Sequence, residues 1–146
     1  MFKIKTIVVA IFILISQELY AAQSVEEIIK GRKAMFSENY QNAKKISILL
    51  KSKKIEEAKP LMKKISDNYK KLLDYFPENT KEGFKTESLP IIWEEKDVFN
   101  ALMQKSSDNM IKLTSVIEDS DDIRATLREF MWSSCKACHS KYRMPH

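Results

Sequence analysis

The sequence of 146 residues contains only two glycines and four prolines. Strands joined by tight turns depend on such residues, whereas here Lys, Glu, Asp, Ser and Asn surround apolar residues at helical spacing. The composition therefore disfavours an architecture built from hairpins and predicts an all-α protein. A chain of this length buries one hydrophobic core, which excludes a multidomain enzyme with a separate cofactor fold.

The sequence also lacks a concentrated stripe of one charge. Its formal net charge is +5, and basic and acidic residues are interleaved along the chain. A nucleic-acid-binding surface would need clustered basic residues, so we expect no nucleic-acid partner. The mild positive surplus favours docking to acidic partner proteins, although most of these charges are typical of an ordinary solvated surface.

The longest apolar run falls short of the roughly 20 residues of a membrane-spanning helix. Basic residues precede this run, residues 7–15, and small residues follow it up to Ala22. This order is typical of a secretory signal peptide cleaved after Ala21 or Ala22, with an uncleaved N-terminal anchor as the alternative. We expect a signal peptide over residues 1–22 and an exported, periplasmic domain over residues 23–146, with no membrane span after cleavage.

Apolar residues at steps of three, four and seven predict four helices. The first opens with a capping box, Ser24 to Glu27, in which each side chain accepts from the other residue's backbone amide. In the second helix Pro60 is tolerable only near the first turn, because proline lacks an amide donor. Pro77 ends that helix, and residues 78–88 show no period, which indicates a longer crossing loop.

The third predicted helix begins near Pro90 and carries apolar residues as far as Ile117. The fourth begins after residues 120–122, which suit a helix N-terminus, and carries apolar residues as far as Tyr142. Four amphipathic helices with mostly short links predict an antiparallel four-helix bundle. The apolar stripe of the first helix runs through Val25, Ile28, Ile29, Phe36, Ala43, Ile46 and Leu50.

The last predicted helix contains the motif Cys135-Lys-Ala-Cys138-His139. The spacing C-x-x-C-H is typical of covalent haem attachment. Two sulfurs three residues apart lie on one helix face, where each can form a thioether with one vinyl group of the same porphyrin. His139 follows directly and can bind the iron as its axial ligand. We therefore expect one haem c, held in the bundle by these three residues.

Two other chemistries use cysteines at this spacing. In an exported protein they could form a disulfide or a thiol-exchange pair, or supply half of a zinc site. The sequence has no βαβ pattern for a thioredoxin-like fold, and its only further histidine is His146. A haem-free helical binding module with a Cys135–Cys138 disulfide is therefore the alternative to the haem protein.

The ending Cys-Lys-Ala-Cys-His-Ser-Lys-Tyr-Arg, up to Arg143, resembles the cytochrome c′ family. The stretch Arg32-Lys-Ala-Met-Phe36 and the residues around Trp93 resemble that family's first and third helices. The resemblance covers nearly the whole mature chain, and its C-terminal motif is the most specific part. It implies that Arg32 and Lys33 approach the haem edge, where they would pair with propionates.

For two of these residues an ordinary interpretation is open as well. Lys33 is equally well explained as part of a solvated helix face. Arg143 resembles the family's arginine on the side of the axial histidine, or is only a cation at a helix C-terminus. The aromatic residues at helical spacing, Trp93, Phe99, Trp132 and Tyr142, are expected to be core.

We expect the protein to carry single electrons between redox partner proteins and not to be an enzyme. The resemblance implies a second activity, the binding of small diatomic gases such as nitric oxide at a five-coordinate iron. Met35 is the candidate for a sixth iron ligand in the first helix. One turn from Arg32, however, lies Phe36, which favours a haem capped by Phe36. The resemblance also implies a possible homodimer through the first two helices, and no residue of the sequence argues for or against it.

Overall fold

The computed structural model describes residues 23–145. The predicted signal peptide, residues 1–22, lies outside this range. The α-helices of the described residues are α1 (Val25–Lys51), α2 (Ile55–Leu72), α3 (Ile91–Glu94), α4 (Lys96–Val116), α5 (Ile123–Leu127) and α6 (Ser133–Tyr142). The predicted all-α fold is confirmed. Within the described residues, no helix is long and apolar enough to cross a membrane.

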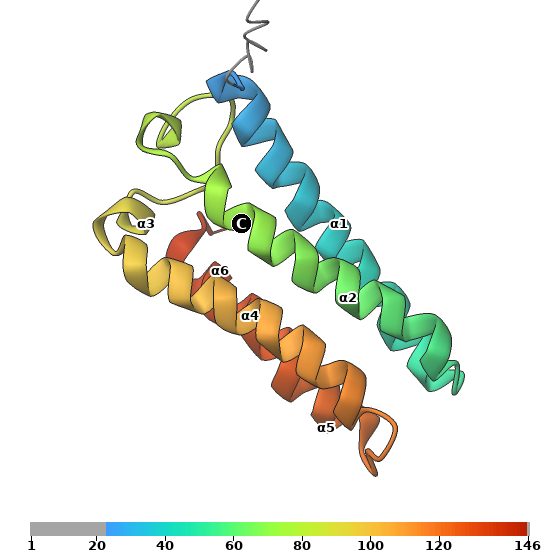
Figure 1. The fold of residues 1–146 in the computed structure, drawn as a ribbon. Coiled ribbons are helices and arrows are strands. Elements are labelled where there is room, and N and C mark those ends of the chain that lie inside the picture. The colour runs from blue at the N-terminus through green and yellow to red at the C-terminus, as the bar shows by residue number, and fades with distance from the viewer. Residues whose placement is uncertain (1–22, 146) are drawn as a thin grey trace, which may run out of the picture.

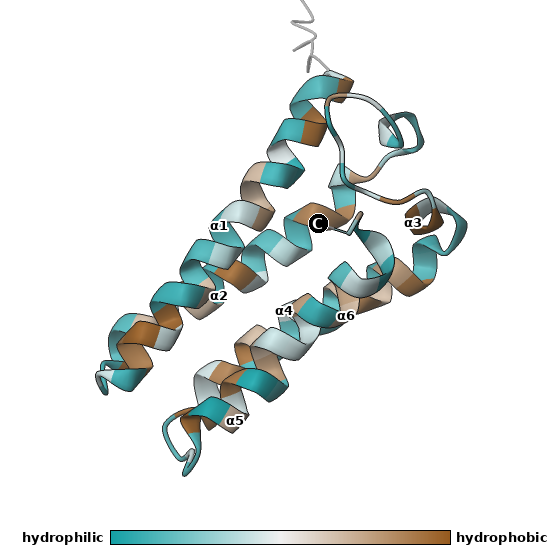
Figure 2. Ribbon diagram, turned by 180° about the vertical axis from the view of Figure 1, so that it is seen from behind, coloured by the Kyte–Doolittle hydropathy of each residue, from teal (hydrophilic) through white to brown (hydrophobic). Residues whose placement is uncertain are grey.

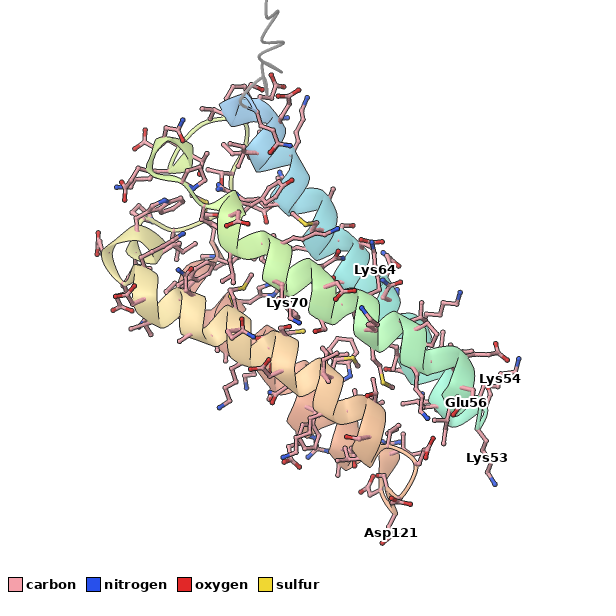
Figure 3. All side chains as sticks on the ribbon, viewed as in Figure 1. Lys53, Lys54, Glu56, Lys64, Lys70 and Asp121 are labelled. Atoms are coloured by element: carbon pink, nitrogen blue, oxygen red, sulfur yellow. The ribbon has the colours of Figure 1, made fainter. Side chains whose placement is uncertain are left out.

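The helices form an antiparallel four-helix bundle (Figure 1). The first two rods are α1 and α2, and the third is α4 with α3 at its start. The fourth contains α5, the π-helical segment Arg128–Trp132 and α6. The chain crosses from α2 to α4 at the end of the bundle where α1 begins (Figure 1). The opposite end holds the short connections, with Lys53 near one tip and Asp121 at the other (Figure 3).

Helix α1 begins at the predicted capping box. The Ser24 hydroxyl accepts from the Glu27 amide, and the Glu27 carboxylate accepts from the Ser24 amide. Figure 2 shows hydrophobic and hydrophilic bands alternating along the helix. Its fully buried residues include two polar ones that the apolar stripe did not contain, Arg32 and Asn39. Arg32 lies three residues after Ile29 and Asn39 lies four residues before Ala43, so these polar residues make the buried face of the helix continuous.

Helix α2 shows where the prediction for Pro60 was wrong. The helix begins at Ile55, so Pro60 lies inside it and beyond its first turn. Proline has no amide hydrogen, so the Glu56 carbonyl does not receive the hydrogen bond that the residue four positions later normally donates in a helix. The burial of the helix's apolar face offsets this loss. That face consists of Ala58, Met62, Ile65, Tyr69 and Leu72.

The third and fourth rods are less regular than the sequence predicted. Glu95 adopts φ −116° and ψ 42°, which separates α3 from α4. In the fourth rod Asp122 caps the start, since its carboxylate accepts from the Ala125 amide at 3.0 Å. The π-helical segment then precedes α6 directly. Such segments inside α-helices are frequent at functional sites.

The crossing loop predicted over residues 78–88 is confirmed, and contacts with the bundle hold it near both of its ends. It contains the 3₁₀ turn Glu78–Thr80 and three consecutive residues with positive φ, beginning with Gly83 at φ 88°. Near its end Ser88 forms a β-bridge with Arg143, which follows α6. The loop therefore lies against the C-terminus of the bundle.

Candidate cofactor site

A cavity of about 790 Å³ lies in the half of the bundle that carries the crossing loop. This volume is within the range of small-molecule and cofactor sites. Its walls come from α1, α2, the crossing loop, α4, the π-helical segment and α6, and they are mostly apolar. Four aromatic rings in edge-to-face contact link the rods around the cavity. The distance between ring centroids is 6.4 Å for Phe36 and Phe76, 4.8 Å for Phe76 and Phe99, and 5.1 Å for Phe99 and Tyr142. The expected burial of Trp93, Phe99 and Tyr142 is confirmed, while Trp132 is only half-buried.

One wall of the cavity is the predicted haem motif. Cys135, Cys138 and His139 all line it, because α6 turns this face toward the bundle. The thiols are partly buried and not joined by a disulfide, and His139 lies at the exposed edge. Tyr69 of α2 reaches the same wall, with its hydroxyl 3.9 Å from Cys135 Sγ.

Burial sets the ionisation of these groups. It raises the pKa of the Cys138 thiol to about 12 and also raises the pKa of Cys135. The pKa of Tyr69 lies well above its ordinary value, chiefly because of burial and also because of Cys135. In an apolar wall these groups stay neutral, since burial disfavours the charged form of each.

Arg32 lines the cavity, and its guanidinium also holds the crossing loop. Nη1 donates to the Thr80 hydroxyl at 2.9 Å and to the Tyr75 carbonyl at 3.1 Å. Nη2 donates to the Thr80 carbonyl at 2.9 Å and to the Thr86 hydroxyl at 2.6 Å. The guanidinium carbon lies 4.6 Å from the centre of the Phe76 ring.

These contacts give Arg32 a role that the sequence did not predict. The side chain is 2% exposed, and burial lowers its pKa to about 10. Four of the five N–H donors of a guanidinium are engaged, three with the crossing loop and one with the Tyr75 carbonyl before it. Pairing of Arg32 with a haem propionate stays a prediction.

The other two predicted cations, Lys33 and Arg143, also line the cavity, at its rim. Lys33 is exposed, and its Nζ donates to the Lys85 carbonyl at 2.9 Å. Arg143 forms an ion pair with Glu87, in which Nη2 and Nε each lie 2.9 Å from Oε2. Both cations therefore contact the crossing loop, and their pairing with haem groups stays a prediction.

Phe36 lines the cavity from α1, whereas Met35 is not among the described residues that line it. Met35 is half-buried and packs against the core. Which of the two residues faces the iron stays a prediction.

Sequence reasoning missed four cavity residues that packing brings to the site. Met110 and Met131 come from α4 and the π-helical segment, where the sequence predicted helices but assigned neither residue to a site. Tyr69 comes from the second predicted helix, α2, and was not assigned to the site either. Asn39, on α1, was not singled out at all. Its position on the apolar stripe, three residues after Phe36 and four before Ala43, is the signal that would have found it.

Comparison with known proteins identifies the relatives of this chain. The family model described as Cytochrome C′ matches residues 27–143. The cytochrome c′ of Rhodopseudomonas palustris is 28% identical over 144 residues, covering 97% of each protein. The cytochrome c′ structure of Shewanella frigidimarina has a TM-score of 0.72 at 25% identity, covering 85% of this chain and 99% of that one.

A more distant relative shows the same fold. It is a ferrous variant of the cytochrome c′ of Alcaligenes xylosoxidans with bound NO. It has a TM-score of 0.71 at 21% identity and covers 86% of this chain and 99% of that one.

The residues present fit the cofactor of these relatives. Two thiols three residues apart and a histidine share one wall of a mostly apolar cavity of suitable size. The match over residues 27–143 covers nearly the whole described chain. The chain therefore belongs to the cytochrome c′ family, whose members carry a covalent c-type haem.

Proposed function

We propose that this protein is a periplasmic one-electron carrier that also binds a small diatomic gas, such as nitric oxide, at a five-coordinate haem iron. The observation that carries the proposal is the composition of the α1 wall of the cavity, where Phe36 is a lining residue and Met35 is not. No histidine lies among the described residues outside α6.

In this proposal Cys135 and Cys138 hold the haem by thioethers, and His139 supplies the axial nitrogen. When bound, the haem would supply the one-electron chemistry. The apolar walls exclude water, and the aromatic residues from Phe36 to Tyr142 fill the space between the rods. No bound substrate is required for electron transfer, so the protein is not an enzyme.

The rim of the cavity supports docking of redox partners. Lys33 and Lys136 are exposed lining residues, so positive charge lies where a partner would approach the haem. Such a rim favours acidic partner proteins by steering their encounter. The relative from Alcaligenes xylosoxidans, which was solved with bound NO, supports the gas-binding part of the proposal.

The test is the optical and spin-state spectrum of the purified holoprotein in both oxidation states, followed by titration of the ferrous form with nitric oxide and carbon monoxide. We expect a high-spin iron in both states and a new spectrum with each gas. A low-spin spectrum with a methionine-to-iron charge-transfer band, and no response to either gas, would refute gas binding and leave an electron carrier. Absence of a covalent haem in the intact mass would refute both.

A further inference from the structure

Asn39 presents an unusual polar group at the cavity wall. Its side chain is 5% exposed and lines the cavity. Among the described residues, its Nδ2 is one of two buried side-chain atoms with no hydrogen-bond partner. Leaving a buried donor unpaired is costly, and such groups are rare in native proteins. An acceptor that enters the cavity would satisfy it.

The direction of this amide is fixed by its neighbours. Asn68 of α2 donates from Nδ2 to the Glu38 carboxylate at 2.7 Å and to Asn39 Oδ1 at 2.8 Å. An ionised carboxylate only accepts, so the Asn68 group that faces Glu38 must be its nitrogen. The same nitrogen meets Asn39, whose oxygen therefore faces α2. The Asn39 nitrogen is turned away from this pair.

The position on α1 relates Asn39 to Phe36. The two residues are three apart, so they lie on the same helix face about one turn from each other. Both line the cavity, as does Arg32 one turn before Phe36. The α1 wall thus consists of a ring, which closes the pocket, and a donor beside it.

Among the described residues, no hydroxyl that lines the cavity is a buried group without a hydrogen-bond partner. Ser106 donates to the Leu102 carbonyl at 2.8 Å, and the Tyr69 hydroxyl lies 3.9 Å from Cys135 Sγ. Ser134 accepts from Asn109 at 3.2 Å. The Asn39 amide is therefore the buried donor of the cavity lining that lacks a partner within the protein.

We propose that Asn39 donates a hydrogen bond to the outer atom of a diatomic gas bound at the haem iron. The inference rests on the proposed function, because it needs an iron that accepts an external ligand. It assigns Asn39 a role in specificity. An amide donor favours ligands that gather negative charge on their outer atom over ligands that stay apolar.

The test compares ferrous carbon monoxide complexes of the purified holoprotein by infrared spectroscopy and by gas dissociation kinetics. A donor to the bound ligand lowers the carbon–oxygen stretching frequency. Asn39→Leu removes the donor at similar volume, and Ser106→Ala is the matched control because it removes a cavity hydroxyl that is already bonded. We expect Asn39→Leu to raise the frequency and to speed dissociation roughly 3- to 10-fold, the effect of one hydrogen bond, while Ser106→Ala changes neither.

A second variant separates the loss of the Asn39 donor from any effect of misfolding. Asn39→Leu leaves the Asn68 amide without its acceptor, so the double variant Asn39→Leu/Asn68→Leu removes both partners, which is often nearly neutral for stability. It should show the same rise in frequency. Carbon monoxide bound with unchanged frequency and dissociation rate in both variants would overturn the inference and leave the proposed function standing. A wild-type iron that binds no gas would overturn both.

Discussion

The α6 wall and the α1 wall of the cavity are built in different ways. On α6 the three predicted haem-binding residues, Cys135, Cys138 and His139, lie within five positions of one helix. On α1 the lining residues run from Arg32 to Ala43, about three turns of the helix, and two of them depend on partners elsewhere. Arg32 binds a loop up to 54 residues away, and Asn39 is oriented by Asn68, 29 residues away. A wall encoded by local spacing can be read from sequence, whereas a wall encoded by distant contacts cannot.

The largest expected effect tests the α6 wall. Replacing both Cys135 and Cys138 with alanine should abolish the covalent haem, because each sulfur forms one thioether. The measurement is intact mass before and after extraction with acidified acetone. Each single variant should keep one thioether, and Ser134→Ala, another change in the α6 wall, should keep both. Haem that resists extraction from the double variant would show that the α6 motif is not the point of attachment.

The second prediction asks how reactive the α6 wall is before haem is attached. Burial raises the pKa of Cys138 from 9.0 to about 12 in the folded chain. Only the thiolate is alkylated, so at pH 8 the folded apoprotein should react at Cys138 roughly 1,000-fold more slowly than the unfolded chain. Alkylation followed by peptide mapping, with and without urea, measures this ratio. Equal rates would show that the wall is open to solvent.

The same shift gives a pH dependence. Between pH 9 and 12 the unfolded chain loses the Cys138 proton first, so the folded state binds more protons. The stability of the apoprotein should therefore fall as the pH rises through this window. Below pH 9 the thiol is protonated in both states, and this contribution is fully present.

The third prediction tests the α1 wall through Arg32. Arg32→Met removes three hydrogen bonds to the crossing loop and one to the Tyr75 carbonyl, and it leaves buried acceptors at Thr80 unpaired. The free energy of unfolding should fall by about 3 kcal/mol in urea denaturation. Arg32→Lys should recover only part of it, because an ammonium does not reproduce the planar fork of donors.

Lys33→Met is the matched control for Arg32. Lys33 is the next residue, is exposed, and donates one bond to the same loop. Its replacement should change the free energy of unfolding by less than about 0.5 kcal/mol. Equal losses for the two variants would show that the loop is not held by the buried guanidinium.

The smallest expected effect separates the neighbours Met35 and Phe36. Met35→Ala should leave the visible and spin-state spectra unchanged and lower stability by about 1 kcal/mol, as expected for a half-buried core residue. Phe36→Ala should alter the spectrum of the ferrous gas complex, because its ring lines the cavity. A charge-transfer band that disappears in Met35→Ala would reverse this order and make the protein a low-spin carrier. Loss of such a band in Met110→Leu or Met131→Leu instead would assign the ligand to another wall.

The sequence predicted the number of rods, the capping box at Ser24, the crossing loop and the α6 motif, because each has a local signature. It misplaced Pro60 because the length of α2 depends on the burial of residues on both sides of the proline. It did not predict the break at Glu95 or the π-helical segment, since neither has a local sequence signal. The polar residues Arg32 and Asn39 were missed as parts of the buried face, because an apolar stripe is defined without them.

The hydrogen bonds of Arg32 to Tyr75, Thr80 and Thr86, here called the clamp, also bear on the order of folding. The α1–α2 and α4–α6 hairpins form from contacts between neighbouring elements, whereas the clamp closes chain segments of 43 to 54 residues. Loop closure over such lengths costs entropy before any contact repays it, so we expect the clamp to form after the hairpins and to open before them. The crossing loop is then the first part of the described chain to exchange its amide hydrogens. Its opening, rather than global unfolding, would then expose the buried guanidinium of Arg32 to solvent.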